Sequence, residues 1–212
     1  MVVALPARRL ELADLTWATA FLESACADNP MLNYCCMGPE AHEQRIWLLE
    51  QLLHFGLRYG RVYTNADTSA LAVWIGPAHP AATLCRLMRT GLLPAALWRL
   101  EWTGFQRLRH FLVAICWLRR HSPTATTHHY LLALAVRPID RGVGLARRLL
   151  RVTLAAMQAA KSPCYLDTQE PRQLAFFQRL GFRLMGECPT GQSADAPTNW
   201  GLVREGQACH SY

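Results

Sequence analysis

The chain has 212 residues, of which 51% are hydrophobic and 17% are charged, and this composition excludes a disordered protein. The length fits one folded domain with a hydrophobic core, and we predict that this domain spans 1–205, followed by a flexible tail over 206–212. The net charge is +7, but the basic residues are spread along the chain. Charge alone therefore predicts no nucleic-acid partner.

The sequence predicts neither a membrane span nor a metal site. No apolar stretch reaches the roughly 18 residues that a spanning helix needs, and the apolar start of the chain is too short for a signal peptide. Segment 111–118 is apolar between arginines, which is typical of a buried helix; contact with a membrane surface is the alternative. The eight cysteines show no zinc spacing, so we expect reduced thiols in a cytoplasmic protein.

The first part of the chain alternates short strands with amphipathic helices. The patterns predict a strand over 8–12, helices over 15–26 and 40–59, and strands over 61–64 and 70–75. Asp14 is the expected N-cap of the first helix, and Gly60 the expected end of the second. A helical region follows over 81–120, with breaks expected near 91–94 and again near Gly104.

The second part begins with a strand that is apolar at nearly every position, which is typical of burial on both faces. The predicted elements are this strand at 130–136, a helix over 142–160, a strand over 164–168, a helix over 171–180, and closing strands over 182–187 and 199–204. The order of elements predicts an α/β domain with a mixed sheet.

A loop of small residues joins the 130–136 strand to the next helix. Gly142, Gly144 and Ala146 keep its backbone free of bulky side chains, and the first amides of a helix have no partner within it. These amides favour an anion, and Arg141 and Arg147 add positive charge. The alternative is a loop needed only for tight packing. The spacing fits neither a dinucleotide-binding fingerprint nor a P-loop.

Residues 141–146, Arg-Gly-Val-Gly-Leu-Ala, resemble the Arg/Gln-x-x-Gly-x-Gly/Ala motif of the GNAT acyltransferases. The preceding Leu-Ala-Val-Arg-Pro and the later Phe-Phe-Gln-Arg-Leu-Gly-Phe at 176–182 resemble two further segments of that family. Within it, the chain is most similar to the puromycin N-acetyltransferase-like branch, through segments at 28–30, 72–74, 128–131 and 164–172. The resemblance spans roughly residues 8–187.

The resemblance implies a single GNAT domain whose mixed, mostly antiparallel sheet opens between its fourth and fifth strands, with a bulge in the fourth. It implies acetyl-CoA as co-substrate and no metal. The pantetheine arm would pair with one stretch of strand and the pyrophosphate would lie on the loop. The implied cofactor-binding residues are Leu134, Ala135, Val136, Arg141, Gly142, Val143, Gly144, Leu145 and Ala146.

The reaction implied is direct attack of a neutral amine on the thioester, without a covalent enzyme intermediate. The family's usual general acid, a tyrosine, is replaced by Phe177, and Leu132 occupies a position that often carries a carboxylate base. Tyr165 or a water is the candidate substitute for the acid. For the base, the candidate catalytic residues are Asp167 and His128, with His129 as a further possibility.

The resemblance places Asn29, Tyr34 and Trp74 near the acceptor, which implies a small-molecule primary amine as the partner. The helical insertion around 81–120 is expected to form a lid or the surface of a homodimer. Two alternatives stay open. One is a degenerate GNAT domain that binds acyl-CoA without efficient turnover, and the other is a nucleic-acid-binding or membrane-associated protein.

Overall fold

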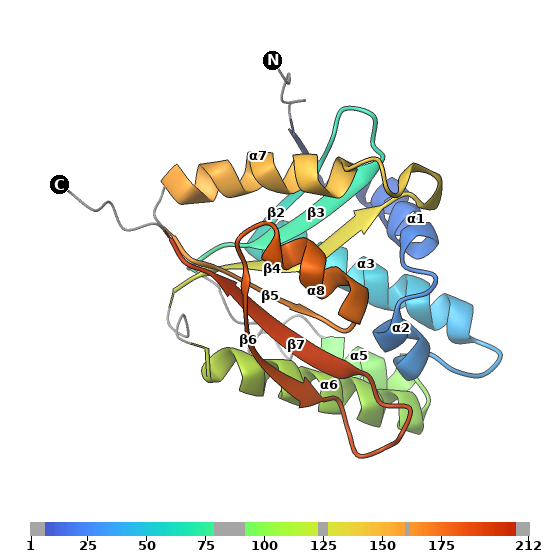
Figure 1. Ribbon diagram of the computed structural model, residues 1–212. Helices are drawn as coiled ribbons and strands as arrows, with labels where there is room; N and C mark the ends of the chain where they lie inside the picture. Colours follow the sequence, from blue (N-terminus) through green and yellow to red (C-terminus); the bar gives the residue numbers. More distant parts are fainter. Residues whose placement is uncertain (1–6, 79–91, 123–126, 160–161, 207–212) are drawn as a thin grey trace.

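The strands of the chain form one mixed sheet, shown in Figure 1. The computed structural model describes residues 7–78, 92–122, 127–159 and 162–206. Within them, the strands follow the order β1-β2-β3-β4-β5-β7-β6. Neighbouring strands are antiparallel except for β4 and β5, which run parallel. The strands are β1 (Arg8–Arg9), β2 (Gly60–Thr64), β3 (Ala70–Ile75), β4 (His129–Val136), β5 (Cys164–Thr168), β6 (Arg183–Pro189) and β7 (Thr198–Arg204).

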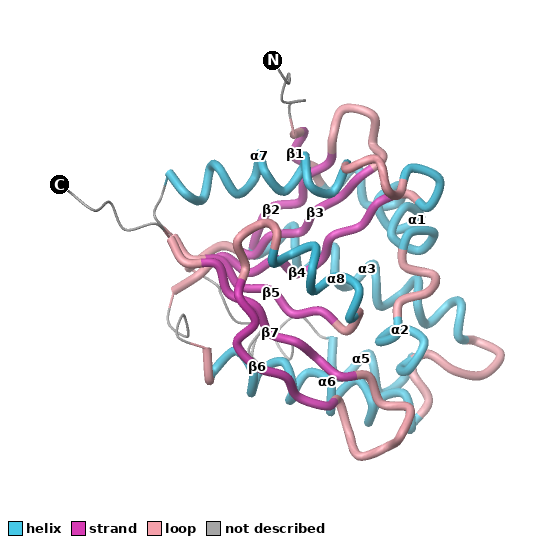
Figure 2. Tube along the Cα trace, in the orientation of Figure 1, coloured by secondary structure: helices cyan, strands magenta, loops and turns pink. Residues whose placement is uncertain are grey.

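Helices cover both faces of this sheet. The described helices are α1 (Leu15–Ala25), α2 (Pro30–Cys35), α3 (Ala41–Tyr59), α5 (Leu92–Arg99), α6 (Trp102–Arg120), α7 (Leu145–Ala159) and α8 (Pro171–Gln178). Short 3-10 turns lie at Leu12–Asp14 and Pro138–Asp140. Figure 2 shows α7 and α8 on one face of the sheet, with the other helices on the opposite face. No helix of the described residues is long and apolar enough to cross a membrane.

Side chains alternate between the two faces along the central strands, so the hydrophobic core is divided between the two layers of helices that cover the sheet. Tyr130 and Tyr165 point to one face, where they join apolar side chains of α2, α3, α5 and α6. Leu131 and Leu166 point to the other face and pack with Leu150 and Leu154 of α7. Because the central strands are buried on both sides, they are apolar at almost every position.

Strands β4 and β5 pair over only three residues and then separate. The paired residues are His129, Tyr130 and Leu131 of β4 with Cys164, Tyr165 and Leu166 of β5. Beyond them, β4 continues to Val136 along β3 alone. The opening that the GNAT resemblance implies is therefore present in the sheet.

A β-bulge lies in β4 where this separation begins. Val73 of β3 is opposite Ala133, while Trp74 is opposite Leu131, so Leu132 is an extra residue in β4. Leu132 and Ala133 both pack on the face that carries α1 and α3, and the alternation resumes with Leu134 on the α7 face. The bulge thus ends one register of pairing with β3. It also shifts the alternation by one residue, so the side chains that follow in β4 point to the opposite faces from those that a regular strand would give.

The expected ends of the first helices are confirmed in position. Asp14 is the N-cap residue of α1, although its carboxylate accepts hydrogen bonds from Arg8 and the Glu11 amide and makes no capping bond. Gly60 follows the last residue of α3 and opens β2, where an added Cβ would lie 1.9 Å from the Trp74 carbonyl oxygen.

The break expected near Gly104 falls between Arg99 and Trp102, where α5 ends and α6 begins. Gly104 itself lies inside α6: an added Cβ would meet the Cys35 carbonyl oxygen at 2.4 Å, so this glycine allows α2 and α6 to pack closely.

Other elements differ from prediction in extent. The first strand is limited to Arg8–Arg9 before the chain turns into a 3-10 helix, and α2 was not predicted. Of the predicted 81–120 helical region, residues 92–120 contain α5 and α6, and 81–91 lie outside the described residues. The predicted tail lies outside them from 207 onward.

Candidate active site

The loop between β4 and α7 presents an open backbone surface. Gly142 and Gly144 have φ angles of +84° and +83°, a region that favours glycine. A Cβ added to either residue would meet no atom within 4 Å, so both glycines face open space. Helix α7 consequently begins at Leu145 and not at Gly142, where the sequence predicted its start.

The amides at this loop are available to a ligand. The first helical hydrogen bond of α7 runs from the Arg148 amide to the Gly144 carbonyl oxygen at 3.0 Å. Among the described residues, the amides of 145–147 that precede it have no backbone acceptor, as is usual in the first turn of a helix. Together with the positive end of the helix dipole, this arrangement favours an anion.

The Arg141 side chain turns away from that open surface. Its Nη2 donates to the Ala25 carbonyl oxygen at 2.7 Å, which ties the loop to the end of α1. Arg148 donates to the Val143 carbonyl oxygen at 3.0 Å, while Arg147 is exposed. Arg141 therefore anchors the loop to α1, and Arg147 is exposed beside the first turn of α7.

A cavity of about 260 Å³ opens between the separated strands. Its walls come from β4 and β5, from the turn before α8, and from five helices of the opposite layer. They include Leu22, Cys26, Asn29, Met31, Leu32, Leu48, Leu52, Phe55, Leu108, Leu112, Ile115, Tyr130, Leu132, Ala133, Leu134, Asp167, Glu170 and Gln173. Most of this lining is apolar, and Asp167 and Glu170 are its two carboxylates.

Asp167 is held by a residue from the neighbouring strand. Tyr130 Oη donates a hydrogen bond to Asp167 Oδ1 at 3.0 Å. Burial raises the pKa of the Asp167 carboxyl to about 6, while the Arg119 charge and the Tyr130 hydrogen bond oppose this rise. Asp167 is ionised above that pH and takes up a proton below it.

Arg119 brings a buried positive charge to the same cluster. Its side chain comes from the last turn of α6, and the residue is only 4% exposed. The guanidinium carbon lies 4.7 Å from the centroid of the Tyr130 ring and 6.0 Å from that of Tyr165. These are cation–π distances, so Arg119, Tyr130 and Asp167 form one contiguous polar group in an otherwise apolar region.

Arg119 and Tyr130 are the residues that the sequence interpretation missed. A signal was present, because Leu108, Leu112, Ile115 and Arg119 recur at the helical spacing of a buried face. An arginine at the fourth position of such a stripe predicts a buried charge with a partner.

The structure separates the two predicted catalytic residues. Asp167 lines the cavity, but His128 lies before β4, at the end where β4 and β5 are still paired. His128 is 1% exposed, and its ring is 5.5 Å from that of Tyr165. His128 is therefore not among the residues that line the cavity. His129 pairs with Cys164 at the same end of the sheet.

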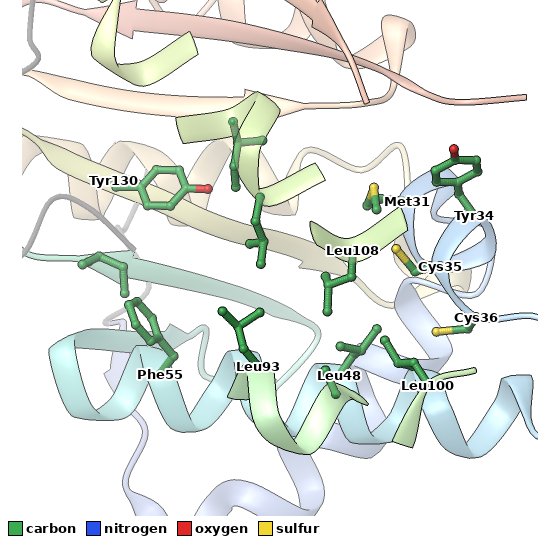
Figure 3. Close-up of a cluster of buried hydrophobic side chains, with 14 of the residues drawn as sticks. Met31, Tyr34, Cys35, Cys36, Leu48, Phe55, Leu93, Leu100, Leu108 and Tyr130 are labelled. Carbon is green, nitrogen blue, oxygen red and sulfur yellow. The ribbon is translucent and has the colours of Figure 1, made fainter. Parts of the chain in front are cut away.

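Of the three predicted pocket residues, one lines the cavity. Asn29 does so, although its side-chain oxygen also caps α2 by accepting from the Met31 and Leu32 amides, each at 3.0 Å. Tyr34 lies at the edge of the apolar cluster far from Tyr130, where Arg107 covers its ring (Figure 3).

Trp74 is on the other face of the sheet. Its Nε1 donates to Thr153 Oγ1 of α7 at 3.2 Å, and the residue is 2% exposed. Trp74 is adjacent to the bulge, so the face of the sheet to which its side chain points could not be inferred without knowing the strand register. Trp74 therefore does not line the cavity between β4 and β5.

The remaining predicted cofactor residues follow the bulge. Leu134 lines the cavity, Ala135 packs against α1 and α3, and Val136 is half-buried on the α7 face. Phe177, at the position of the family's tyrosine, is 3% exposed and packs edge-on against Phe182. It belongs to the core beneath α8.

Comparisons with known proteins agree with this geometry. The model of the acetyltransferase (GNAT) family matches residues 101–182, which contain Arg119, Tyr130, the 141–146 loop and Asp167. An uncharacterized N-acetyltransferase of Schizosaccharomyces pombe is 24% identical over 188 residues, covering 83% of this chain and 73% of that protein.

Two solved structures are similar over nearly the whole chain. A Corynebacterium glutamicum protein described as histone acetyltransferase HPA2 and related acetyltransferase has a TM-score of 0.63 at 18% identity, covering 97% of this chain and 98% of the other. Arylalkylamine N-acetyltransferase 2 from Aedes aegypti also has a TM-score of 0.63, at 14% identity, covering 95% and 99%.

The fold is that of the GNAT acyltransferases. The match of the GNAT family model over residues 101–182 and the relative from Schizosaccharomyces pombe support an enzyme of the N-acetyltransferase class. The closer resemblance to the puromycin N-acetyltransferase-like branch stays a prediction.

Proposed function

We propose that this protein is an acetyl-CoA-dependent N-acetyltransferase that acts on a primary amine of a small molecule. The observation that carries the proposal is the cavity at the parting of β4 and β5, which holds an ionisable carboxylate and is bounded by the strand that leads into an open, glycine-rich helix start. The family matches support the same class of reaction.

The cofactor would lie along two parts of the chain. Gly142 and Gly144 face open space, and the free amides of 145–147 suit the pyrophosphate, with Arg147 adding positive charge. Past the bulge, β4 has no partner on its β5 side, so its peptide groups from Leu132 to Val136 suit the pantetheine arm. An amide there would also stabilise the negative charge that develops on the thioester oxygen.

Asp167 is the proposed general base. It would accept the proton that the amine loses as nitrogen forms its bond to the acyl carbon and the carbon–sulfur bond breaks. The departing thiolate takes its proton from water. With the pKa of Asp167 raised by burial to about 6, the carboxylate is ionised at neutral pH yet more basic than an exposed aspartate.

Two other groups are poorly placed for chemistry. Burial raises the pKa of the Cys164 thiol to about 12, so it is not an activated nucleophile. Tyr165, the candidate acid, points its hydroxyl toward Gly201 of β7, and burial raises its pKa far above the usual range. Direct transfer without an enzyme-bound acyl group is the simpler course.

A degenerate domain that binds acyl-CoA without efficient turnover is the second candidate. The observation that favours it is Phe177, which fills the family's tyrosine position with a buried ring and offers no acid for the leaving thiolate. Losing a general acid costs about 10²-fold in rate, and a thiolate is a fair leaving group without one.

Thiol release separates the two candidates. Purified protein is mixed with acetyl-CoA and a panel of primary amines, and free CoA thiol is followed with time. The proposal expects amine-dependent release, with N-acetylated product found by mass spectrometry. CoA binding by calorimetry without release for any amine would favour the degenerate domain, and no CoA binding would refute both.

A further inference from the structure

The outer side of α6 carries a stripe of aromatic, aliphatic and basic side chains. At about 100° per residue, six of its positions fall within one sector of about 80°, opposite the side on which Leu108 and Leu112 line the cavity. The six are Trp102, Gln106, Arg109, Val113, Trp117 and Arg120. Half or more of the surface of Trp102, Val113 and Trp117 is exposed, so the stripe is not used to build the core.

Helix α5 extends this stripe at its Trp102 end. The two helices lie on the side of the sheet away from α7 (Figure 1), and both contribute to the same hydrophobic cluster. Trp98, four residues before Trp102, is 89% exposed, and Leu97 and Arg99 beside it are exposed as well. Ten large hydrophobic side chains are exposed among the described residues, and five of them lie on α5 and α6. Such a concentration marks a contact site for another molecule.

The charge on this α5–α6 surface is entirely basic. Arg99, Arg109 and Arg120 are exposed, and neither helix contains an acidic residue. Arg109 donates to Gln106 Oε1 at 2.9 Å, and no carboxylate of the described residues forms an ion pair with any of the three arginines. The surface therefore offers indole rings and uncompensated positive charge side by side.

We propose that the α5–α6 surface binds the surface of an anionic lipid membrane. Indole rings favour the boundary between headgroups and acyl chains, where Leu97 and Val113 are also accommodated. Arginines beside them reach lipid phosphates while their aliphatic stems stay on the apolar side. Each such charge strengthens binding to an anionic bilayer. The contact is peripheral, and it does not depend on the proposed acetyltransferase activity.

Two other occupants fit the same surface less well. A second copy of the chain, packed symmetrically, would bring two sets of arginines together with no carboxylate on either helix to separate them. A single-stranded nucleic acid would stack on the tryptophans and pair with the arginines, but the aliphatic Leu97 and Val113 would gain nothing from it. The membrane surface is the partner that uses all three kinds of side chain.

Cosedimentation of the full chain with lipid vesicles tests the proposal. The vesicles contain phosphatidylcholine alone or with about 30% phosphatidylglycerol, and no CoA is present. We expect a partition coefficient at least tenfold higher for the anionic vesicles, roughly what two to three arginines supply. Equal partitioning into both kinds of vesicle, or no binding to the anionic ones, would overturn the proposal.

Matched pairs of substitutions locate the contact. Arg109→Gln with Arg120→Gln should lower the partition coefficient about 25-fold, roughly fivefold for each charge. Arg172→Gln with Arg179→Gln removes the same charge from exposed positions at α8, in the opposite layer, and should change it less than about threefold. Equal losses in the two double variants would mean that net charge, and not this surface, attracts the vesicles.

Brominated lipids report which indole rings enter the membrane, because bromine quenches nearby tryptophan fluorescence. The triple replacement of Trp98, Trp102 and Trp117 by Phe keeps apolar rings at the surface, so the protein should still bind vesicles but lose most of the quenching. Trp17→Phe on α1 is the control and should retain it. Quenching that persists in the triple variant would overturn the proposal.

The competing contacts give different results. Saturating CoA should leave vesicle binding unchanged, and displacement of the vesicles by CoA would move the contact to the loop before α7. A dimer in analytical ultracentrifugation that Trp117→Ser dissociates would make this surface a subunit interface. Tighter binding of a labelled single-stranded oligonucleotide than of anionic vesicles, weakened by the Arg109 and Arg120 substitutions, would assign it to nucleic acid. Any of these three results would overturn the proposal and leave the proposed acetyltransferase function untouched.

Discussion

The polar cluster in the cavity combines side chains from three elements. Asp167 comes from β5, Tyr130 from β4 and Arg119 from the last turn of α6. Desolvation raises the pKa of Asp167, and its two neighbours limit that rise. The balance leaves a carboxylate that is ionised at neutral pH but still accepts a proton readily.

Replacing Asp167 tests its role as the base. Asp167→Asn should lower kcat/KM by about 10²-fold and leave the CoA dissociation constant within about threefold of the wild-type value. The wild-type pH profile of kcat/KM should fall below pH about 6, where Asp167 gains a proton, and the variant should lack this limb. Glu205→Gln, which alters an exposed carboxylate at the end of β7, serves as the control. A variant that keeps the acidic limb would assign it to another group.

Tyr130→Phe removes only the hydrogen bond to Asp167, because the aromatic ring over which Arg119 lies is kept. A hydrogen bond to the carboxylate stabilises its charged form, so removing it raises the pKa of Asp167 further. The acidic limb of kcat/KM should therefore move to higher pH. Tyr63→Phe on β2 gives the reference for a tyrosine outside the cavity. A limb that stays in place or moves to lower pH contradicts the hydrogen-bond assignment.

At the scale of elements, two irregularities position the site. The bulge at Leu132 ends the regular pairing of β4, and the glycines of the next loop turn the chain into α7. Each interrupts an otherwise continuous pattern of hydrogen bonds. The peptide groups freed in this way are those that we assign to the cofactor.

The loop can be tested with a pair of isosteric residues. Asn and Asp both tolerate positive φ at position 144, so the two variants differ mainly in charge. Gly144→Asp should weaken CoA binding at least about tenfold more than Gly144→Asn, because a carboxylate would lie beside the pyrophosphate. Isothermal titration calorimetry measures both. Gly76→Asp, at an open position with ordinary backbone, is the control and should leave the affinity for CoA unchanged. Equal affinities for the Asp and Asn variants would remove the loop from the cofactor site.

The packing of β5 against β7 gives a prediction about stability. The Tyr165 hydroxyl is buried without a hydrogen-bond partner among the described residues, and a Cβ on Gly201 would lie 2.8 Å from it. Tyr165→Phe should leave the free energy of unfolding unchanged or raise it by about 1 kcal/mol. Gly201→Ala should lower it by about 1 to 3 kcal/mol.

A double-mutant cycle in urea checks this contact. If the hydroxyl causes the clash, Gly201→Ala should cost less in the Tyr165→Phe background than in the wild-type chain. Additive effects would place the strain elsewhere.

At the scale of the whole molecule, the site lies where the two halves of the sheet meet. Strands β1 to β4 form an antiparallel half, β5 to β7 form another, and a short parallel contact joins them. Exposed arginines at positions 137, 147 and 151 lie along or near the loop and α7, in a chain with a net charge of +7. Their charge favours the approach of a polyanion such as CoA.

Salt should therefore weaken the cofactor complex. Between about 50 and 500 mM NaCl, we expect the CoA dissociation constant to rise roughly tenfold, because exposed charges are screened over this range. The affinity for a neutral amine analogue in the apolar cavity should change little. Random duplex DNA, tested at about 150 mM salt, should not compete with CoA. Competition by DNA would instead support the nucleic-acid hypothesis.

Much of this arrangement was predictable from local patterns. The apolar run of β4, the small-residue loop and the helix after it are defined by neighbouring residues, since backbone geometry and burial act over short distances. Asp167 was also a candidate, because it ends a buried strand. The predicted residues that lie away from the cavity, among them Trp74 and His128, depend on strand register and on which end of the strand pair opens.

The amino-acid pattern was sufficient for the mixed α/β architecture, for the small-residue loop before α7 and for the residue types that could do the chemistry. The folded chain was needed to show that Leu132 is a bulge, that Trp74 faces α7, and that Arg119 reaches Tyr130 and Asp167. The reason is physical: periodicity and turn chemistry are local, whereas register and charge pairing depend on residues far apart in the chain.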